Sequence, residues 1–211
     1  MADGATTAGP RRPEQMTERQ LDRRRRVLDA VHELLAGAPT HEVQVKDIAE
    51  HAGVSLAAIY GYFSSKDHLL GEALVDWAGR MNTGARRRSL PKDPADRFGA
   101  LVQRGVRAYR REPQYAALFL FVAASSDPHA IECMGRLSEH VGGGVGPEVR
   151  ERLDHGPADV QRIVGNAWTG GLFECVHGLS TFAELERSMA AACRLLLLAA
   201  GDGVESDTRV S

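Results

Sequence analysis

Residues 45–70 read VKDIAEHAGVSLAAIYGYFSSKDHLL, and this stretch predicts two short helices joined by a tight turn. Val45 and Ile48 begin a set of apolar side chains at helical spacing, which indicates the first helix. Gly53 then ends that helix, because glycine readily takes the left-handed backbone that a sharp reversal requires. Ser55 can cap the second helix by accepting a hydrogen bond from a free backbone N–H. The stretch therefore predicts a helix-turn-helix.

The second helix of this pair is about two turns long. Its pattern directs Ile59 and Phe63 toward the core, and Tyr60 and Tyr62 toward solvent or a partner. Two serines then interrupt the pattern and cap a third, longer helix that begins at Lys66. The motif thus has a docking helix behind it.

These residues resemble the signature of the TetR family of bacterial transcriptional regulators. The resemblance covers roughly residues 20 to 80, and beyond Met81 only the general layout agrees. The positions that carry it are Gly53-Val54, Ser55, Ile59-Tyr60, Tyr62-Phe63, Ser65-Lys66 and Leu69-Leu70. It implies a protein that binds operator DNA as a dimer and is released when a small molecule occupies the C-terminal domain.

The same resemblance implies which residues touch DNA. In the family's register, base edges would face Lys46, Leu56, Ala57, Tyr60 and Gly61, and phosphates would face Ala58, Tyr62 and Lys66, with Ser55 at the start of the helix. Leu56, Ala57 and Gly61 carry no side-chain hydrogen-bond donor, whereas many relatives have a polar or basic residue there. Apolar side chains can still read thymine methyl groups, and DNA shape can add specificity. The alternative for each tyrosine is that it only packs.

The charge of the chain does not by itself favour DNA. The net charge is −2, and residues 1–90 hold 13 Lys and Arg against 12 Asp and Glu. Local charges must therefore attract DNA, since the whole-protein field will not. Arg23–Arg26 form a basic turn early in the first helix, which would either contact phosphates or lie in solvent.

The order of segments predicts an all-α fold of about nine helices: an N-terminal helix-turn-helix domain followed by a C-terminal helical ligand-binding and dimerisation domain. Pro91 and Pro94 mark the boundary between the halves. The predicted segments are a disordered arm at 1–16, the DNA-binding domain at 17–64, a connecting helix at 65–90, the C-terminal domain at 91–201 and a disordered tail at 202–211. Residues 142–147 form a glycine-rich loop that lacks the spacing of a dinucleotide site.

The last two predicted helices lie within residues 157–200. Small residues on the first of them would allow close approach of another helix, and the second has a wide apolar stripe. Such a stripe could be ordinary core. In a TetR-like protein these helices form the homodimer, and so short a chain offers little else to cover them. We therefore expect a homodimer through residues 157–200.

A ligand pocket can be sketched in the C-terminal half. Aromatic and aliphatic side chains with a few polar anchors could line an apolar cavity, although each anchor is more often an ordinary surface or helix residue. The candidates are Trp77, Gln103, Tyr115, Phe119, Met134, Leu137, Asn166, Trp168 and Phe173. Residues 115–137 also resemble TetR-like repressors of sterol and fatty-acyl catabolism in actinobacteria. The effector expected is a small apolar molecule such as a steroid or a fatty acyl-CoA.

Other classes of function find little support in the sequence. The His32-Glu33 pair lacks the second histidine of a zinc-protease motif, and no nucleophile elbow is present. Three isolated cysteines suggest neither a metal site nor a disulfide framework, so we expect no cofactor or metal. With no signal peptide or membrane-length apolar run, a cytoplasmic protein is expected. The remaining alternatives are a helix-turn-helix protein without a small-molecule ligand and a helical-bundle enzyme.

Overall fold

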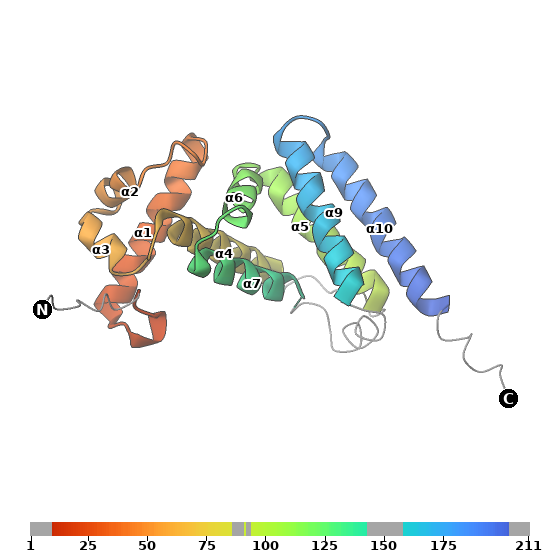
Figure 1. Ribbon diagram of the computed structural model, residues 1–211, viewed down its shortest axis with the longest axis horizontal. Helices are drawn as coiled ribbons and strands as arrows, with labels where there is room; N and C mark the ends of the chain where they lie inside the picture. The colour runs from red at the N-terminus through yellow and green to blue at the C-terminus, as the bar shows by residue number, and fades with distance from the viewer. Residues whose placement is uncertain (1–9, 86–90, 92–93, 143–157, 203–211) are drawn as a thin grey trace, which may run out of the picture. The chain divides into compact units, whose positions relative to one another are not determined.

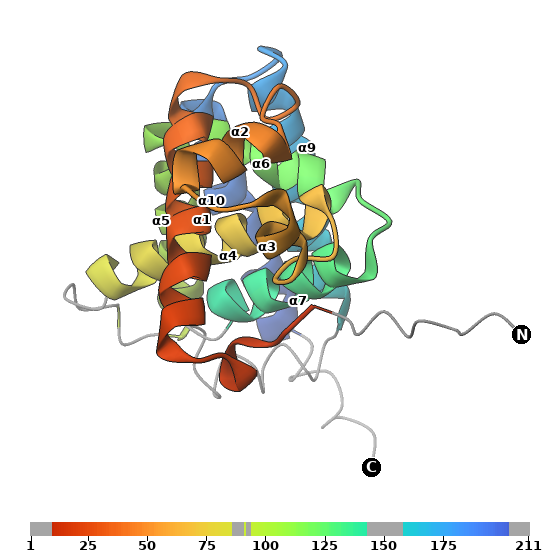
Figure 2. The same cartoon turned by 90° about the vertical axis from the view of Figure 1, so that its left-hand side faces the viewer.

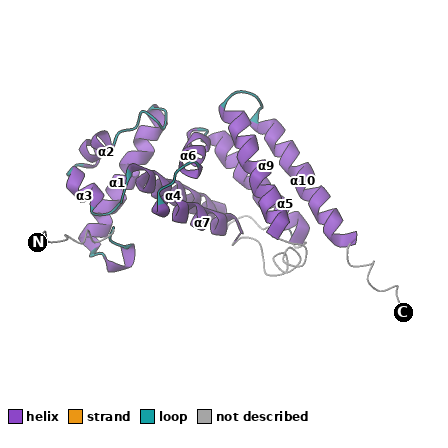
Figure 3. Ribbon diagram, viewed as in Figure 1, coloured by secondary structure: helices purple, strands orange, loops and turns teal. Residues whose placement is uncertain are grey.

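The computed structural model describes residues 10–85, 91, 94–142 and 158–202, and these residues form helices and loops without a strand (Figures 1 and 3). This confirms the all-α prediction. The helices described are η1 (Pro13–Gln15, a 3-10 helix), α1 (Glu18–Gly37), α2 (Val45–Ala52), α3 (Leu56–Tyr60), α4 (Lys66–Ala85), α5 (Pro94–Arg111), α6 (Gln114–Ala123), α7 (Pro128–Gly142), α9 (Ala158–Val176) and α10 (Phe182–Asp202). None of them is long and apolar enough to cross a membrane.

Two helices begin at capping boxes, in which a threonine is followed three residues later by a glutamine or a glutamate. At α1, the backbone N–H of Thr17 donates to Oε1 of Gln20 at 2.9 Å. At α10 the exchange is reciprocal, because Thr181 N–H donates to Glu184 Oε2 at 2.8 Å and Glu184 N–H donates back to Thr181 Oγ1 at 3.2 Å. Each exchange satisfies backbone donors that a helix start leaves without partners.

The N-terminal arm differs from the prediction of disorder through residue 16. Pro13–Gln15 form the 3-10 helix η1, and Met16 N–H donates to the Pro13 carbonyl at 3.1 Å. Pro13 suits the first position of a helix, where its missing N–H costs nothing. Residues 1–9 lie outside the described residues, as do 203–211 of the predicted tail and 143–147 of the predicted glycine-rich loop.

The chain divides into two compact units that do not follow the linear order of the sequence. The first contains residues up to Trp77 together with Phe121–Gly135, and the second contains Ala78–Leu120 and the residues from Arg136 onward. Helices α4, α6 and α7 therefore each contribute residues to both units. The first unit includes the helix-turn-helix and the segment that joins α6 to α7.

In the second unit, α5, α9 and α10 lie side by side (Figure 1). Gly105 and Gly171 permit these close approaches. A Cβ at Gly105 would lie only 2.5 Å from the Trp168 ring, and one at Gly171 would overlap the side chain of Leu185. The aromatic rings of Tyr109 and Trp168 meet edge to face at 5.7 Å. These contacts join the three helices.

Candidate DNA-binding site and its supporting core

The turn of the helix-turn-helix is built as the sequence predicts. Gly53 has φ 62° and ψ 43°, the left-handed conformation that ends α2. The backbone N–H of Ala58 donates to Ser55 Oγ at 3.1 Å, so Ser55 caps α3. At the other end of this five-residue helix, the Gly61 N–H donates to the Ala57 carbonyl. Local hydrogen bonds thus fix both ends of α3, and Gly53 sets the turn before it.

Helix α3 presents an exposed and uncharged surface. Leu56 is 44% exposed and Tyr60 is 52% exposed, and Ala57 and Gly61 are exposed beside them. Lys46, at the start of α2, is also exposed. These residues can reach a partner, but α3 itself offers methyl groups and a phenol hydroxyl and no cation.

Tyr62 corrects one prediction. Its side chain is only 6% exposed, so the expectation that the ring faces solvent is wrong, while the contact of its hydroxyl with a phosphate stays a prediction. The reason is that α3 ends at Tyr60, and the following turn directs both Tyr62 and Phe63 inward, where their rings meet edge to face at 6.4 Å. Ala58 is half-buried, with its N–H used by the Ser55 cap.

Lys66 begins α4 and already has neighbours within the chain. Its Nζ lies 3.5 Å from the carbonyl oxygen of His41 and 5.7 Å above the ring of Phe121. The cation is therefore held at the start of the docking helix, half-buried, next to the helix-turn-helix.

Two of the four arginines in the basic turn have structural roles. Arg24 pairs with Glu72 at 2.5 Å, and its guanidinium lies 5.2 Å above the ring of Phe63. Arg26 donates from Nη1 to the Ala52 carbonyl at 3.0 Å, which satisfies a carbonyl at the end of α2. These two arginines thus join α1 to α4 and α2, and sequence spacing alone could not reveal either partner.

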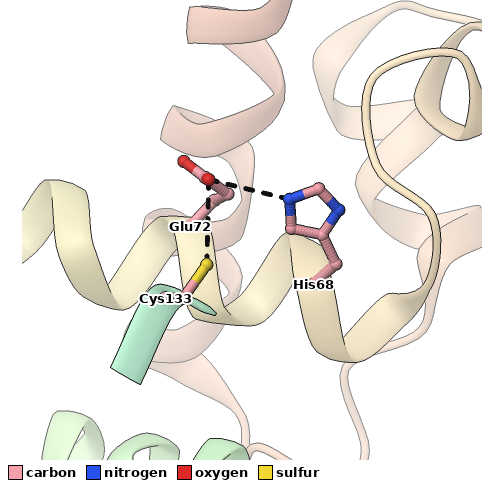
Figure 4. Close-up of side chains that lie close together, drawn as sticks. All are labelled: His68, Glu72 and Cys133. Atoms are coloured by element: carbon pink, nitrogen blue, oxygen red, sulfur yellow. Dashed lines mark hydrogen bonds and ion pairs between the residues drawn. The ribbon is translucent and has the colours of Figure 1, made fainter. Parts of the chain in front are cut away.

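A polar network lies in the core behind the motif (Figure 4). Ser65 Oγ accepts from the backbone N–H of His68 at 3.0 Å, and His68 Nδ1 accepts from the N–H of Ser64 at 3.0 Å. The other ring nitrogen of His68 lies 3.6 Å from Glu72 Oε1, to which the Cys133 thiol also donates at 3.7 Å. The hydrogen bond from the His68 N–H to Ser65 Oγ confirms the predicted serine cap of α4. The hydrogen bond from the Ser64 N–H to the His68 ring adds a histidine to this cap.

His68, Glu72 and Cys133 have the residue types of a metal site, and one donor atom from each lies within 4.8 Å of the others. Two observations argue against that use. Since His68 Nδ1 accepts a backbone hydrogen bond, the proton of a neutral imidazole sits on Nε2, the atom that faces Glu72. The guanidinium of Arg24 already neutralises Glu72. The geometry therefore fits a buried hydrogen-bond network better than a metal centre.

The segment joining α6 to α7 completes this core. Asp127 caps α7 by accepting from the His129 N–H at 2.8 Å, and Ser125 donates from Oγ to Asp67 at 2.5 Å. Burial would raise the pKa of Asp127, but hydrogen bonds to its carboxylate outweigh burial and hold the pKa below its ordinary value. The ring of His129 stacks on that of His68 at 4.8 Å. The α6–α7 segment is thereby attached to the start of α4.

The candidate ligand-binding residues differ in burial and are divided between the two units. Buried positions are Trp77, Tyr115, Phe119 and Leu137, half-buried ones are Gln103, Met134 and Trp168, and exposed ones are Asn166 and Phe173. Trp77 and Met134 belong to the first unit and the others to the second. Exposure of Asn166 and Phe173 contradicts the expectation that both line an interior cavity.

The cysteines outside the network have raised thiol pKa values. Burial raises the pKa of Cys193 to about 11, and burial with nearby carboxylates raises that of Cys175. Both thiols are therefore protonated at neutral pH and weakly nucleophilic.

A capped and exposed α3 supported by a docking helix defines a helix-turn-helix DNA-binding regulator. The model of "Bacterial regulatory proteins, tetR family" matches residues 27–73. The chain is 28% identical over 193 residues to the HTH-type transcriptional repressor KstR of Rhodococcus jostii, covering 87% of this chain and 85% of that protein. It is 25% identical over 190 residues to KstR of Mycobacterium tuberculosis, covering 86% and 83%.

Solved structures agree with these relatives. A TetR transcriptional regulator from Rhodococcus sp. RHA1 matches with a TM-score of 0.73 and 26% identity, covering 86% of this chain and 98% of that one. FadR of Bacillus subtilis, solved with stearoyl-CoA, shares the fold with a TM-score of 0.58 and 15% identity, covering 80% and 96%. Residues 27–73 thus carry the DNA-binding domain of the TetR family of transcriptional regulators, and the KstR relatives are regulators and not enzymes.

Proposed function

We propose that this regulator is a repressor that binds a palindromic operator as a homodimer and is released by a small apolar ligand. The observation that carries the proposal is the exposed face of α3, held by the Gly53 turn and the Ser55 cap. In this proposal α3 enters the major groove, where Leu56 and Ala57 contact thymine methyl groups and the Tyr60 hydroxyl can hydrogen-bond. Lys46 reaches from the start of α2.

Exposed apolar residues on helix α9 support the proposal of a homodimer. Ile163 and Phe173 are 48% and 49% exposed and project from the same side of the helix as Gly170, where a Cβ would meet nothing within 4 Å. Exposed apolar side chains beside a glycine suit close packing against a second copy of the helix. The exposure of Phe173 that argues against an interior pocket thus fits a place in the dimer interface.

The effector proposed is an apolar molecule such as a steroid or a fatty acyl-CoA. Support comes from the apolar aromatic residues of the second unit, and the stearoyl-CoA bound to FadR supplies one probe of that class. A tenfold loss of operator affinity requires a coupling free energy of only about 1.4 kcal/mol between effector and DNA. The α6–α7 segment, attached to α4 through Asp67 and His68, is a route by which such coupling can reach α3.

A mobility-shift titration tests ligand control. The full chain on a footprinted operator is titrated with hydrophobic acids, steroids and acyl-CoA esters, and one class should lower DNA affinity about tenfold or more. A polar compound of equal charge serves as the control. If none of these ligands changed the affinity while the footprint remained, the alternative of a helix-turn-helix protein without a small-molecule ligand would be preferred.

Lys66 provides a test of the phosphate contacts. We expect Lys66→Ala to weaken binding to all duplexes alike and to lower the slope of log K against log salt by about one unit, because one phosphate contact is lost. Thermal unfolding of the free variant separates this effect from loss of the His41 and Phe121 contacts. A variant with lower stability but an unchanged salt slope would show that Lys66 serves only the fold.

A further inference from the structure

We propose that Arg11 and Arg12 form a second DNA-contacting site, which enters the minor groove beside the half-site read by α3. The proposal rests on the proposed function, because it requires α3 to lie in the major groove. The ligand is duplex DNA with a narrow, A·T-rich minor groove next to each half-site.

The backbone places this pair at the end of α3. The N–H of Arg11 donates to the carbonyl of Gly61, the residue that follows α3, at 3.4 Å. The 3-10 helix η1 and the cap at Thr17 turn the chain before α1 begins. Figure 2 shows residues 10–16 leaving the start of α1 and passing beside the helix-turn-helix. An N-terminal segment is thus attached to the element that reads DNA.

Both arginine side chains are available to a ligand. They are exposed, and neither guanidinium has an ion pair or hydrogen bond with the residues that the structure describes. Pro10 and Pro13 flank them, and Arg12 has φ −75° and ψ 146°, the extended conformation typical of polyproline II. Prolines restrict the free chain, so less conformational entropy is lost when this segment is ordered on DNA.

Apart from Arg11 and Arg12, the motif offers few cations to DNA, chiefly the exposed Lys46 and the half-buried Lys66. Helix α3 has no cation, and Arg24 and Arg26 already bind Glu72 and the Ala52 carbonyl. The guanidinium groups of Arg11 and Arg12, which have no partner among the described residues, add positive charge at the end of α3. A helix in the major groove ends at a phosphate strand, and the minor groove lies on the other side of that strand. The planar guanidinium suits a narrow groove of negative potential.

The test begins with an operator selected from random duplexes by the full-length chain. Its flanks are then made of A·T, G·C or inosine·cytosine pairs. Inosine lacks the minor-groove amino group of guanine, so these pairs resemble A·T in the minor groove and G·C in the major groove. Wild type should bind A·T and inosine·cytosine flanks equally and G·C flanks about tenfold more weakly. The double variant Arg11→Ala/Arg12→Ala should lose this preference, with a salt slope lower by about two units.

The control is Arg110→Ala/Arg111→Ala, which removes the same charge from exposed positions of α5 in the second unit. This control should keep the flank preference, and circular dichroism should show both variants folded. A double variant at Arg11 and Arg12 with wild-type affinity and flank preference would overturn the site. So would a wild-type protein indifferent to the flanks, since the contacts would then be to phosphates alone. Failure of wild type to select any duplex would overturn the proposed function, and this site with it.

Discussion

Glu72→Ala should lower the free energy of unfolding by about 3 kcal/mol, because it leaves the guanidinium of Arg24 without its partner in a largely buried site. The side chains of Arg24 and Glu72 are 15% and 13% exposed, and Glu72 also accepts from Cys133 and faces His68. Urea unfolding at fixed protein concentration measures the change. The expected loss is large for a protein of ordinary stability.

Glu33→Ala is the matched control for this prediction. Glu33 pairs with His51 at the same N–O distance of 2.5 Å, but its side chain is 66% exposed. Water screens that pair, so we expect a loss of less than about 1 kcal/mol. Equal losses in the two variants would contradict the argument that burial decides the strength of the Arg24–Glu72 pair. Glu72→Gln keeps hydrogen bonds and removes the charge, so its loss in free energy of unfolding should lie between those of Glu72→Ala and Glu33→Ala.

The parts of the fold that the sequence predicts are those decided locally. The turn at Gly53, the cap at Ser55 and the capping boxes at Thr17 and Thr181 depend on residues within three or four positions of one another. Such contacts form whenever the helix forms, so a sequence pattern is sufficient to find them. The same logic applies to the starts of α5 at Pro94, of α7 at Pro128 and of α6 directly after Pro113.

The parts that the sequence could not predict depend on distant residues. Tyr62 alternates with exposed positions, yet the end of α3 turns it inward, a choice made by tertiary packing. Arg24 looks like a possible phosphate contact until its partner 48 residues away is known. The proline-marked boundary at residues 91–94 also gave no sign that 121–135 belong with the helix-turn-helix. Periodicity reports a buried face, but it does not identify what covers that face.

Replacing Ile163 and Phe173 together by aspartate should convert the protein to a monomer and abolish tight operator binding. Both side chains are about half exposed on α9, so a charged residue at each is tolerated in the isolated chain. In the proposed dimer the same carboxylates would be buried and would face their symmetry copies, which is strongly unfavourable. Sedimentation velocity should therefore show a monomer, with helical circular dichroism unchanged.

The effect on DNA follows from the geometry of a twofold dimer. Two α3 helices about 34–36 Å apart enter successive major grooves, and the second contact is made at high effective concentration once the first has formed. A monomer makes only one of these contacts and loses the effect of high effective concentration. Its operator affinity should therefore fall about a hundredfold or more. Ile131→Asp is the control, because Ile131 is 56% exposed on α7 and lies outside the proposed interface. This variant should remain a dimer. A wild-type protein that sediments as a monomer, with a footprint lacking a dyad, would contradict the dimer itself.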